Sequence, residues 1–169
     1  MANLNPKKVS DSAINDQTYK VFPNDLNSTD TVFGGLVMGI LDRVALVVAE
    51  RHSEKSCVTA SVDSMHFLAP ARRGDILIFK AAINRTWRSS MEIGVKVLTE
   101  HYATRETKHI LSAYFTFVAV DEERQPIPVP PIVPETPLEK RRYEEAEGRR
   151  KRRKQEKEDR LRRREELGF

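Results

Sequence analysis

The chain has 169 residues, of which 39% are apolar and 32% charged, and this suits one folded domain of ordinary size. A single cysteine excludes an internal disulfide, and no apolar run approaches the ~18 residues that a membrane span needs. The net charge of +4 belongs to residues 138–169, which carry 14 Lys or Arg against 9 Asp or Glu, whereas residues 1–137 carry 15 against 16, so a general nucleic-acid-binding surface is poorly supported.

The first predicted elements are a flexible segment over residues 1–14 and a short strand. The N-terminus lacks the apolar stretch of a secretory signal, so we expect a cytoplasmic protein. Residues 17–22 have strand-like composition, and the Pro-Asn-Asp that follows is a turn signal. An irregular stretch continues from there to about residue 33.

Residues 34–52 are predicted to form one long, apolar helix. Its apolar residues recur at helical spacing and form a broad stripe, which predicts burial: Leu36, Val37, Ile40, Leu41, Val44, Ala45 and Val48. The other face carries Gly35, Gly39 and Asp42 among apolar residues. An interior helical glycine costs roughly 1 kcal/mol relative to alanine, so we expect another surface to pack closely against this face.

Four segments rich in β-branched and aromatic residues follow the helix, at about 57–67, 75–87, 90–100 and 110–120. Short polar connections favour antiparallel pairing. The order of elements predicts an α+β domain over residues 15–124, in which a curved antiparallel sheet wraps around the helix. Such a sheet leaves one helix face uncovered, and we expect a second subunit to cover it.

A linker and a charged tail complete the chain. Residues 125–137 contain six prolines and predict a stiff, extended linker. Thr136, Pro137 and Glu139 then fit a helix start with an N-cap and a capping box. The tail over 138–169 is predicted to be a charged helix that is mainly solvated and frays at its far end.

The segment from Asn27 to Asp42 carries the clearest chemical signal. It places an amide, the pair Gly34 and Gly35, and a carboxylate around the start of the helix. Glycines let a ligand approach the first backbone N–H groups, which carry the positive end of the helix dipole. An anionic or carbonyl-like group could bind there, although Asn27 also suits a turn, the glycines also suit tight packing, and Asp42 also suits an exposed position.

Two other kinds of site are disfavoured. The four histidines, at positions 52, 66, 101 and 109, show no metal-ligand spacing with Cys57 and are interpreted as structural or surface residues. Cys57 has no neighbouring motif that would make it a nucleophile. The chain also lacks the Gly-x-Ser-x-Gly elbow of a serine hydrolase.

Several motifs occur in order along nearly the whole chain: Asn27, Val32-Phe33-Gly34-Gly35, Leu41-Asp42, Val58-Thr59-Ala60-Ser61-Val62-Asp63, Ser90-Met91-Glu92-Ile93, Ser112-Ala113-Tyr114-Phe115-Thr116-Phe117, Pro128-Val129-Pro130 and Val133-Pro134-Glu135-Thr136. With these motifs the chain resembles the hot-dog-fold acyl-CoA thioesterases, in the cytosolic acyl-CoA hydrolase branch. The resemblance implies hydrolysis of a fatty acyl-CoA to a free acid and coenzyme A. It also implies a homo-oligomer built from dimers, with sites between two subunits; a trimer of dimers is expected by the resemblance, and the choice between a hexamer and a tetramer is left open.

The catalytic roles follow from that resemblance. Backbone N–H groups near Gly34 and Gly35 would stabilise the oxyanion, and losing one such donor typically costs about 3 to 4 kcal/mol of barrier. Asn27 would orient the carbonyl or the attacking water, and Asp42 would act as general base or as nucleophile. Because Asp42 lies roughly 12 Å along the helix from its start, it would serve the partner subunit's Asn27.

The resemblance also implies a coenzyme A path. Its expected residues are Thr59, Ala60 and Ser61 on one edge, Arg88, Ser89, Ser90 and Met91 on a second edge, and Arg149 or Arg150 at a phosphate. Ser89 and Ser90 equally suit a plain hairpin. No metal, cofactor, nucleic acid or membrane partner is implied.

Three other functions remain open at this point. A hydratase or dehydratase on the same fold usually relies on a His or Glu on the helix, where this chain has Asp42. A non-catalytic acyl-CoA sensor would not need both Asn27 and Asp42. An RNA-associated protein with a basic tail fits poorly with the near-neutral body. The acyl chain length is left open.

Overall fold

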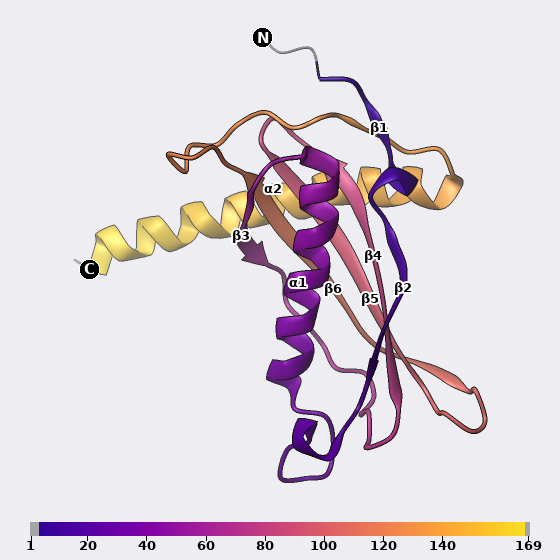
Figure 1. The fold of residues 1–169 in the computed structure, drawn as a ribbon. Coiled ribbons are helices and arrows are strands. Elements are labelled where there is room, and N and C mark those ends of the chain that lie inside the picture. Colours follow the sequence, from indigo (N-terminus) through magenta and orange to yellow (C-terminus); the bar gives the residue numbers. More distant parts are fainter. Residues whose placement is uncertain (1–3, 168–169) are drawn as a thin grey trace.

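A computed structural model, which describes residues 4–167, shows a curved five-stranded sheet with one long helix on each side (Figure 1). The sheet is antiparallel throughout and has the order β2-β4-β5-β6-β3. Its strands are β2 (Ile14–Lys20), β3 (Cys57–Val62), β4 (Ile76–Thr86), β5 (Ser90–Glu100) and β6 (Thr107–Ala119). The expected α+β hot-dog architecture is confirmed, with α1 (Gly34–Ser53) in the concave face of the sheet.

Helix α1 forms over almost the range that its periodicity predicts. Its buried stripe includes Leu41, Val44 and Val48, all at most 1% exposed, and it packs on the inward residues of the sheet. The helix is capped by Glu54, which adopts the left-handed conformation and donates its N–H to the carbonyl of Glu50. Burial of the apolar stripe against the sheet therefore fixes which face of α1 remains outside.

The predicted strand over 57–67 is shorter in the structure, because β3 ends at Val62. β3 lies at the edge of the sheet and pairs only with β6 among the described strands. Just after β3, Asp63 N donates to Tyr114 O, and the next backbone bond to β6 runs from Leu68 N to Ile110 O. Strand composition alone does not report where pairing stops.

The N-terminal segment and the proline-rich linker meet beside the domain. Strand β1 (Lys7–Lys8) pairs in parallel with β7 (Ile132–Val133), and Val9 of the 3-10 turn η1 (Val9–Asp11) is buried. A second 3-10 turn, η2 (Pro23–Asp25), follows β2. These contacts hold residues 7–11 against the linker, while the flexibility expected over 1–14 stays a prediction.

Helix α2 (Pro137–Leu167) begins with the predicted capping box. Glu139 N donates to Thr136 Oγ1 over 3.2 Å, and Thr136 N donates to Glu139 Oε2 over 2.9 Å. The expectation of a solvated helix is wrong for its first half, which crosses the convex face of the sheet with Ala146 fully buried and Arg149 8% exposed. The partner of Arg149 is a residue of the sheet, and the sequence pattern of the helix alone cannot show such a partner.

The far half of α2 agrees with the expectation. From 154 to 166 its side chains are exposed, except that Asp159 is half-buried. In the part of the chain that the structure describes, no helix is long and apolar enough to cross a membrane.

Candidate active site

The loop before α1 holds Asn27 in a defined orientation. Its Oδ1 accepts hydrogen bonds from Thr29 N over 2.9 Å and Thr31 N over 3.2 Å, and its Nδ2 donates to Thr31 Oγ1 over 2.9 Å. This is the turn role that sequence reasoning weighed as the simpler alternative. The same turn fixes the amide beside the start of α1, so the two roles are compatible.

An apolar cavity of about 390 Å³ opens next to Asn27. Asn27, Thr31 and Gly34 lie at its polar part, and the rest of its wall is apolar: Val32, Val37, Phe67, Leu68, Ala69, Pro70, Ala71 and Ile110. An apolar cavity lined by a few polar groups suits a ligand with a polar head and an apolar chain.

The two glycines at the start of α1 have different surroundings. A Cβ at Gly34 would lie 3.4 Å from Cζ of Phe67, an ordinary contact, so packing within the chain does not itself require glycine there. A Cβ at Gly35 would lie 2.5 Å from Cε1 of Phe33, so here the glycine accommodates a ring of its own chain. The N-cap residue Phe33 makes no side-chain cap, and the first N–H groups of a helix have no intrahelical acceptor. The helix start can therefore receive a carbonyl or oxyanion.

Asp42 is half-buried and is joined to β3. Thr59 Oγ1 donates a hydrogen bond of 2.7 Å to Asp42 Oδ1. Sequence reasoning placed Thr59 on a coenzyme A path and missed this contact. No spacing pattern links a strand residue to a helix residue 17 positions away.

One protomer presents two half-sites. Asn27 and Gly34 border the cavity, whereas Asp42 lies two turns along α1, on a face with Met38 45% exposed and with open space beside Gly39. Eight residues of helix separate Gly34 from Asp42, or roughly 12 Å. The structure therefore does not bring Asn27 and Asp42 together within one chain.

A β-bulge separates the three residues expected on the first coenzyme A edge. Thr59 pairs with Phe117, while Ser61 pairs with Thr116, so Ala60 is the extra residue. A bulge shifts the alternation of side chains by one residue. Thr59 therefore faces α1 and Asp42, whereas Ser61 belongs to the row of residues on the convex face.

The second expected edge lies at the other end of the sheet. In the turn between β4 and β5, Arg88 O accepts a backbone hydrogen bond from Val129 N, and Ser89 O accepts one from Ala119 N. This turn lies near the C-terminal end of α1. Twenty residues of α1, roughly 30 Å, separate this end from Asn27. Ser90 begins β5 there, and Met91 is 0% exposed, so its side chain belongs to the core.

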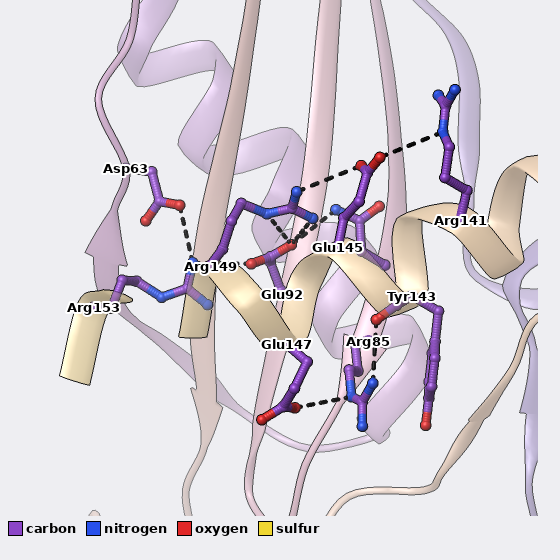
Figure 2. Close-up of polar contacts among 10 residues, drawn as sticks. Asp63, Arg85, Glu92, Arg141, Tyr143, Glu145, Glu147, Arg149 and Arg153 are labelled. Atoms are coloured by element: carbon purple, nitrogen blue, oxygen red, sulfur yellow. Dashed lines mark hydrogen bonds and ion pairs between the residues drawn. The ribbon is translucent and has the colours of Figure 1, made fainter. Parts of the chain in front are cut away.

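Neither tail arginine is free in this structure. Arg149 donates from Nε over 3.0 Å and from Nη2 over 2.7 Å to the buried carboxylate of Glu92 (Figure 2). The guanidinium of Arg150 lies 4.6 Å from the ring centroid of Trp87. A phosphate-binding role for either residue stays a prediction.

The other titratable groups near α1 have structural surroundings. His52 is buried, its Nε2 lies 2.8 Å from Pro130 O, and burial lowers its pKa. Burial likewise raises the pKa of the Cys57 thiol, which makes a thiolate less accessible. Within residues 4–167, no group of three or more His, Cys, Asp or Glu is arranged to hold a metal ion.

Comparison with known proteins identifies the family. Residues 29–104 match the Thioesterase superfamily. An uncharacterized acyl-CoA thioester hydrolase of Bacillus subtilis is 42% identical over 120 residues, which span 71% of this chain and 70% of the relative.

Solved structures agree in fold over nearly the full chain. An apo-hexameric acyl-CoA thioesterase has a TM-score of 0.87 and 38% identity, covering 90% of this chain and 97% of that one. An acyl-CoA hydrolase of Staphylococcus aureus, in complex with butyryl coenzyme A, coenzyme A and coenzyme A disulfide, has a TM-score of 0.88 and 36% identity, covering 96% and 99%. Mutants of that enzyme replace an asparagine, an aspartate or a threonine with alanine. The present chain belongs to the thioesterase superfamily and, within it, to the acyl-CoA thioester hydrolases.

Proposed function

We propose that this chain hydrolyses acyl-CoA thioesters to a free acid and coenzyme A at sites that two copies of the chain build together. One observation carries the proposal. The start of α1 has no side-chain cap and lies beside Asn27 and the apolar cavity. The same helix also carries Asp42, which is hydrogen-bonded to Thr59 and lies on a face that the sheet of its own chain leaves open. Neither half is sufficient, and a two-fold partner supplies the missing half to each.

The chemistry uses groups of both protomers. Water, deprotonated by Asp42 of one protomer, attacks the thioester carbonyl held at Asn27 of the other. The N–H groups of Gly34 and Gly35 stabilise the oxyanion, and its collapse breaks the C–S bond and releases the coenzyme A thiolate, which takes up the proton. The residue types replaced in the S. aureus mutants are those found here at Asn27, Asp42 and Thr59.

The assembly follows from the open face of α1. A partner helix packed against Gly35, Met38 and Gly39 brings its own aspartate toward this chain's cavity. A trimer of such dimers is consistent with the hexameric thioesterase among the structural neighbours. Arg88 and Arg150, with Ala60 and Ser61, are candidate contacts for the nucleotide part of the substrate.

The proposed reaction needs only water and the chain's own groups. We therefore expect thiol release to persist after treatment with a metal chelator and without any added cofactor. A cytoplasmic location, where acyl-CoA substrates are available, completes the proposal.

Complementation between inactive variants tests it. Asn27→Ala and Asp42→Ala are each expected to lose thiol release from palmitoyl-CoA and shorter acyl-CoAs, whereas Glu50→Ala, an exposed change on the same helix, retains it. When the two inactive variants are mixed and reassembled, half of the dimers are mixed and one of their two sites is intact, so about a quarter of the wild-type activity returns. A site contained in one chain returns none.

Two further outcomes would replace this proposal. Binding of acyl-CoA by the wild type without turnover indicates a sensor. Hydration of crotonyl-CoA indicates a hydratase on the same fold.

A further inference from the structure

A buried cluster of charges ties α2 to the sheet. Glu92 of β5 is 0% exposed, and its Oε1 accepts bonds from Arg149 and, over 3.1 Å, from Asn84 Nδ2. Arg153 Nη1 donates over 2.9 Å to Glu92 Oε2 and over 2.9 Å to Asp63 Oδ2 (Figure 2). Glu145 Oε2 also lies 3.8 Å from Arg149 Nη1, and Arg153 bridges the carboxylates of Glu92 and Asp63.

The bridge joins a central strand to the end of an edge strand. Glu92 pairs with Thr116 of β6, and Thr116 pairs in turn with Ser61 of β3, so the three residues form one row across the sheet. Asp63 comes two residues after Ser61 and directly follows Val62, the last residue of β3. Arg153 therefore holds the residue that follows β3 to β5 over the convex face.

The end of β3 lies between the two halves of the candidate site along the chain. Upstream of the bulge, Thr59 bonds Asp42. Downstream of Asp63 the regular ladder stops, and the chain supplies the cavity wall from Phe67 to Pro70, where Leu68 N donates to Ile110 O of β6. Asp63 thus stands between the residue that orients the carboxylate and the wall of the apolar cavity.

Backbone pairing alone holds this region weakly. β3 is bonded to β6 on one side, the bulge at Ala60 interrupts that ladder, and after Asp63 the next backbone bond to β6 is that of Leu68 N to Ile110 O. Charge-assisted hydrogen bonds are roughly twice as strong as neutral ones, and the side chains of Arg153 and Asp63 are only 18% and 20% exposed. Leaving Glu92 buried without its arginines is costly, so the cluster favours α2 in this docked position.

We propose that Arg153 is a positioning residue for the substrate site, which fixes the end of β3 through Asp63 and Glu92 and thereby sets the wall of the acyl cavity from the opposite face of the sheet. This role rests on the proposed hydrolysis of acyl-CoA. It gives the C-terminal helix a part in substrate selection by chain length, because the wall that it holds lines the cavity rather than the catalytic groups.

Variants of the bridge test this role in the full-length protein. In Arg153→Gln, we expect faster amide hydrogen exchange over residues 59–70, and a KM for palmitoyl-CoA raised roughly tenfold with a smaller change for acetyl-CoA and a similar kcat. Asp63→Ala removes the same link and leaves Glu92 paired with Arg149, so we expect the same result from it. It takes the place of Arg153→Gln if that variant folds poorly. Arg153→Lys retains a charged donor and restores much of the wild-type KM.

The matched control is Arg152→Gln, an exposed arginine on the same helix. Unchanged exchange over residues 59–70 in both bridge variants would overturn the proposal, and so would a ratio of palmitoyl-CoA to acetyl-CoA efficiency equal to that of the control. If the wild type releases no thiol from any acyl-CoA, the proposed function fails. The rate of amide exchange over residues 59–70 in the bridge variants still decides whether Arg153 positions β3, because faster exchange supports that role and unchanged exchange contradicts it.

Discussion

Thr59 acts on Asp42 from a different element, and their 2.7 Å hydrogen bond selects one orientation of the carboxylate. A hydrogen bond to a charged group is typically worth about 1.5 to 3 kcal/mol, so Thr59→Val should lower kcat/KM about tenfold or more. Valine keeps the shape of threonine, so stability should change little. The measurement is thiol release at several acyl-CoA concentrations.

Thr59→Ser is the control for that substitution, because serine keeps the hydroxyl. It should retain most of the activity. Equal loss in the serine and valine variants would show that the methyl group, rather than the hydrogen bond, matters.

His52 should make the stability of the protein sensitive to mild acid. Burial lowers its pKa from the ordinary value of 6.5, so the unfolded chain takes up a proton more readily than the folded one. Its contribution to stability is therefore present above pH 6.5 and is lost as the pH falls below that value. We expect Tm to fall between about pH 7 and about pH 5, measured by thermal unfolding.

His52→Gln removes the titration while keeping a donor that can reach Pro130 O. The variant loses some packing, so the slope of Tm with pH is compared rather than Tm itself. A slope as steep as that of the wild type would assign the acid sensitivity to other groups.

At the level of helices and strands, sequence reasoning succeeds where a hydrophobic pattern is long and local. The periodic stripe of α1 and the alternation in β5 predict those elements to within about a residue. The end of β3 depends on where its neighbour stops pairing, and no local pattern reports that. Asn27, Gly34 and Asp42 could be singled out from their positions around one helix start.

Other parts of the site could not be predicted, because they depend on contacts between distant elements. Arg149 meets Glu92 across 57 residues, and the bulge at Ala60 turns Ser61 away from Thr59. A basic helix has the same sequence pattern whether it is solvated or docked on a buried carboxylate. The residues that the sheet offers to the helix decide whether it is solvated or docked.

The start of α2 gives a prediction about that docked helix. Thr136→Ala removes the hydroxyl that accepts from Glu139 N, and loss of such a cap typically costs about 1 kcal/mol. For a chain of this size we expect Tm to fall by about 2 to 4 °C, followed by circular dichroism. Thr136→Ser keeps the cap and should behave as the wild type, so equal destabilisation of the two variants would contradict the capping role.

The molecule as a whole has one apolar helix face without a cover of its own. Met38 is 45% exposed on the side of α1 that carries Gly39 and Asp42, and Val62, which is 42% exposed and pairs with the core residue Phe115, lies on the neighbouring edge strand β3. Apolar side chains that share an exposed face commonly mark an interface. The proposed dimer covers this face and completes the site in the same step, so assembly and activity should be lost together.

Gly39→Ala distinguishes an uncovered helix face from one packed in the proposed dimer, because alanine is favourable in the first case and unfavourable in the second. In the single chain an added Cβ meets nothing within 4 Å, so alanine should stabilise α1 by about 1 kcal/mol. Against a closely packed partner helix the same methyl group is crowded, and overpacking of about 1 to 3 kcal/mol should weaken association on the order of tenfold or more. Sedimentation and activity at falling protein concentration measure this.

The matched control for Gly39→Ala is Gly148→Ala on α2, where an added Cβ would lie 3.9 Å from Arg152 Nη1, an ordinary contact. It should leave both assembly and activity unchanged. If Gly39→Ala instead raises Tm and keeps the wild-type assembly and activity on dilution, the partner does not pack against this face. The aspartate of each site must then come from another arrangement of the two chains.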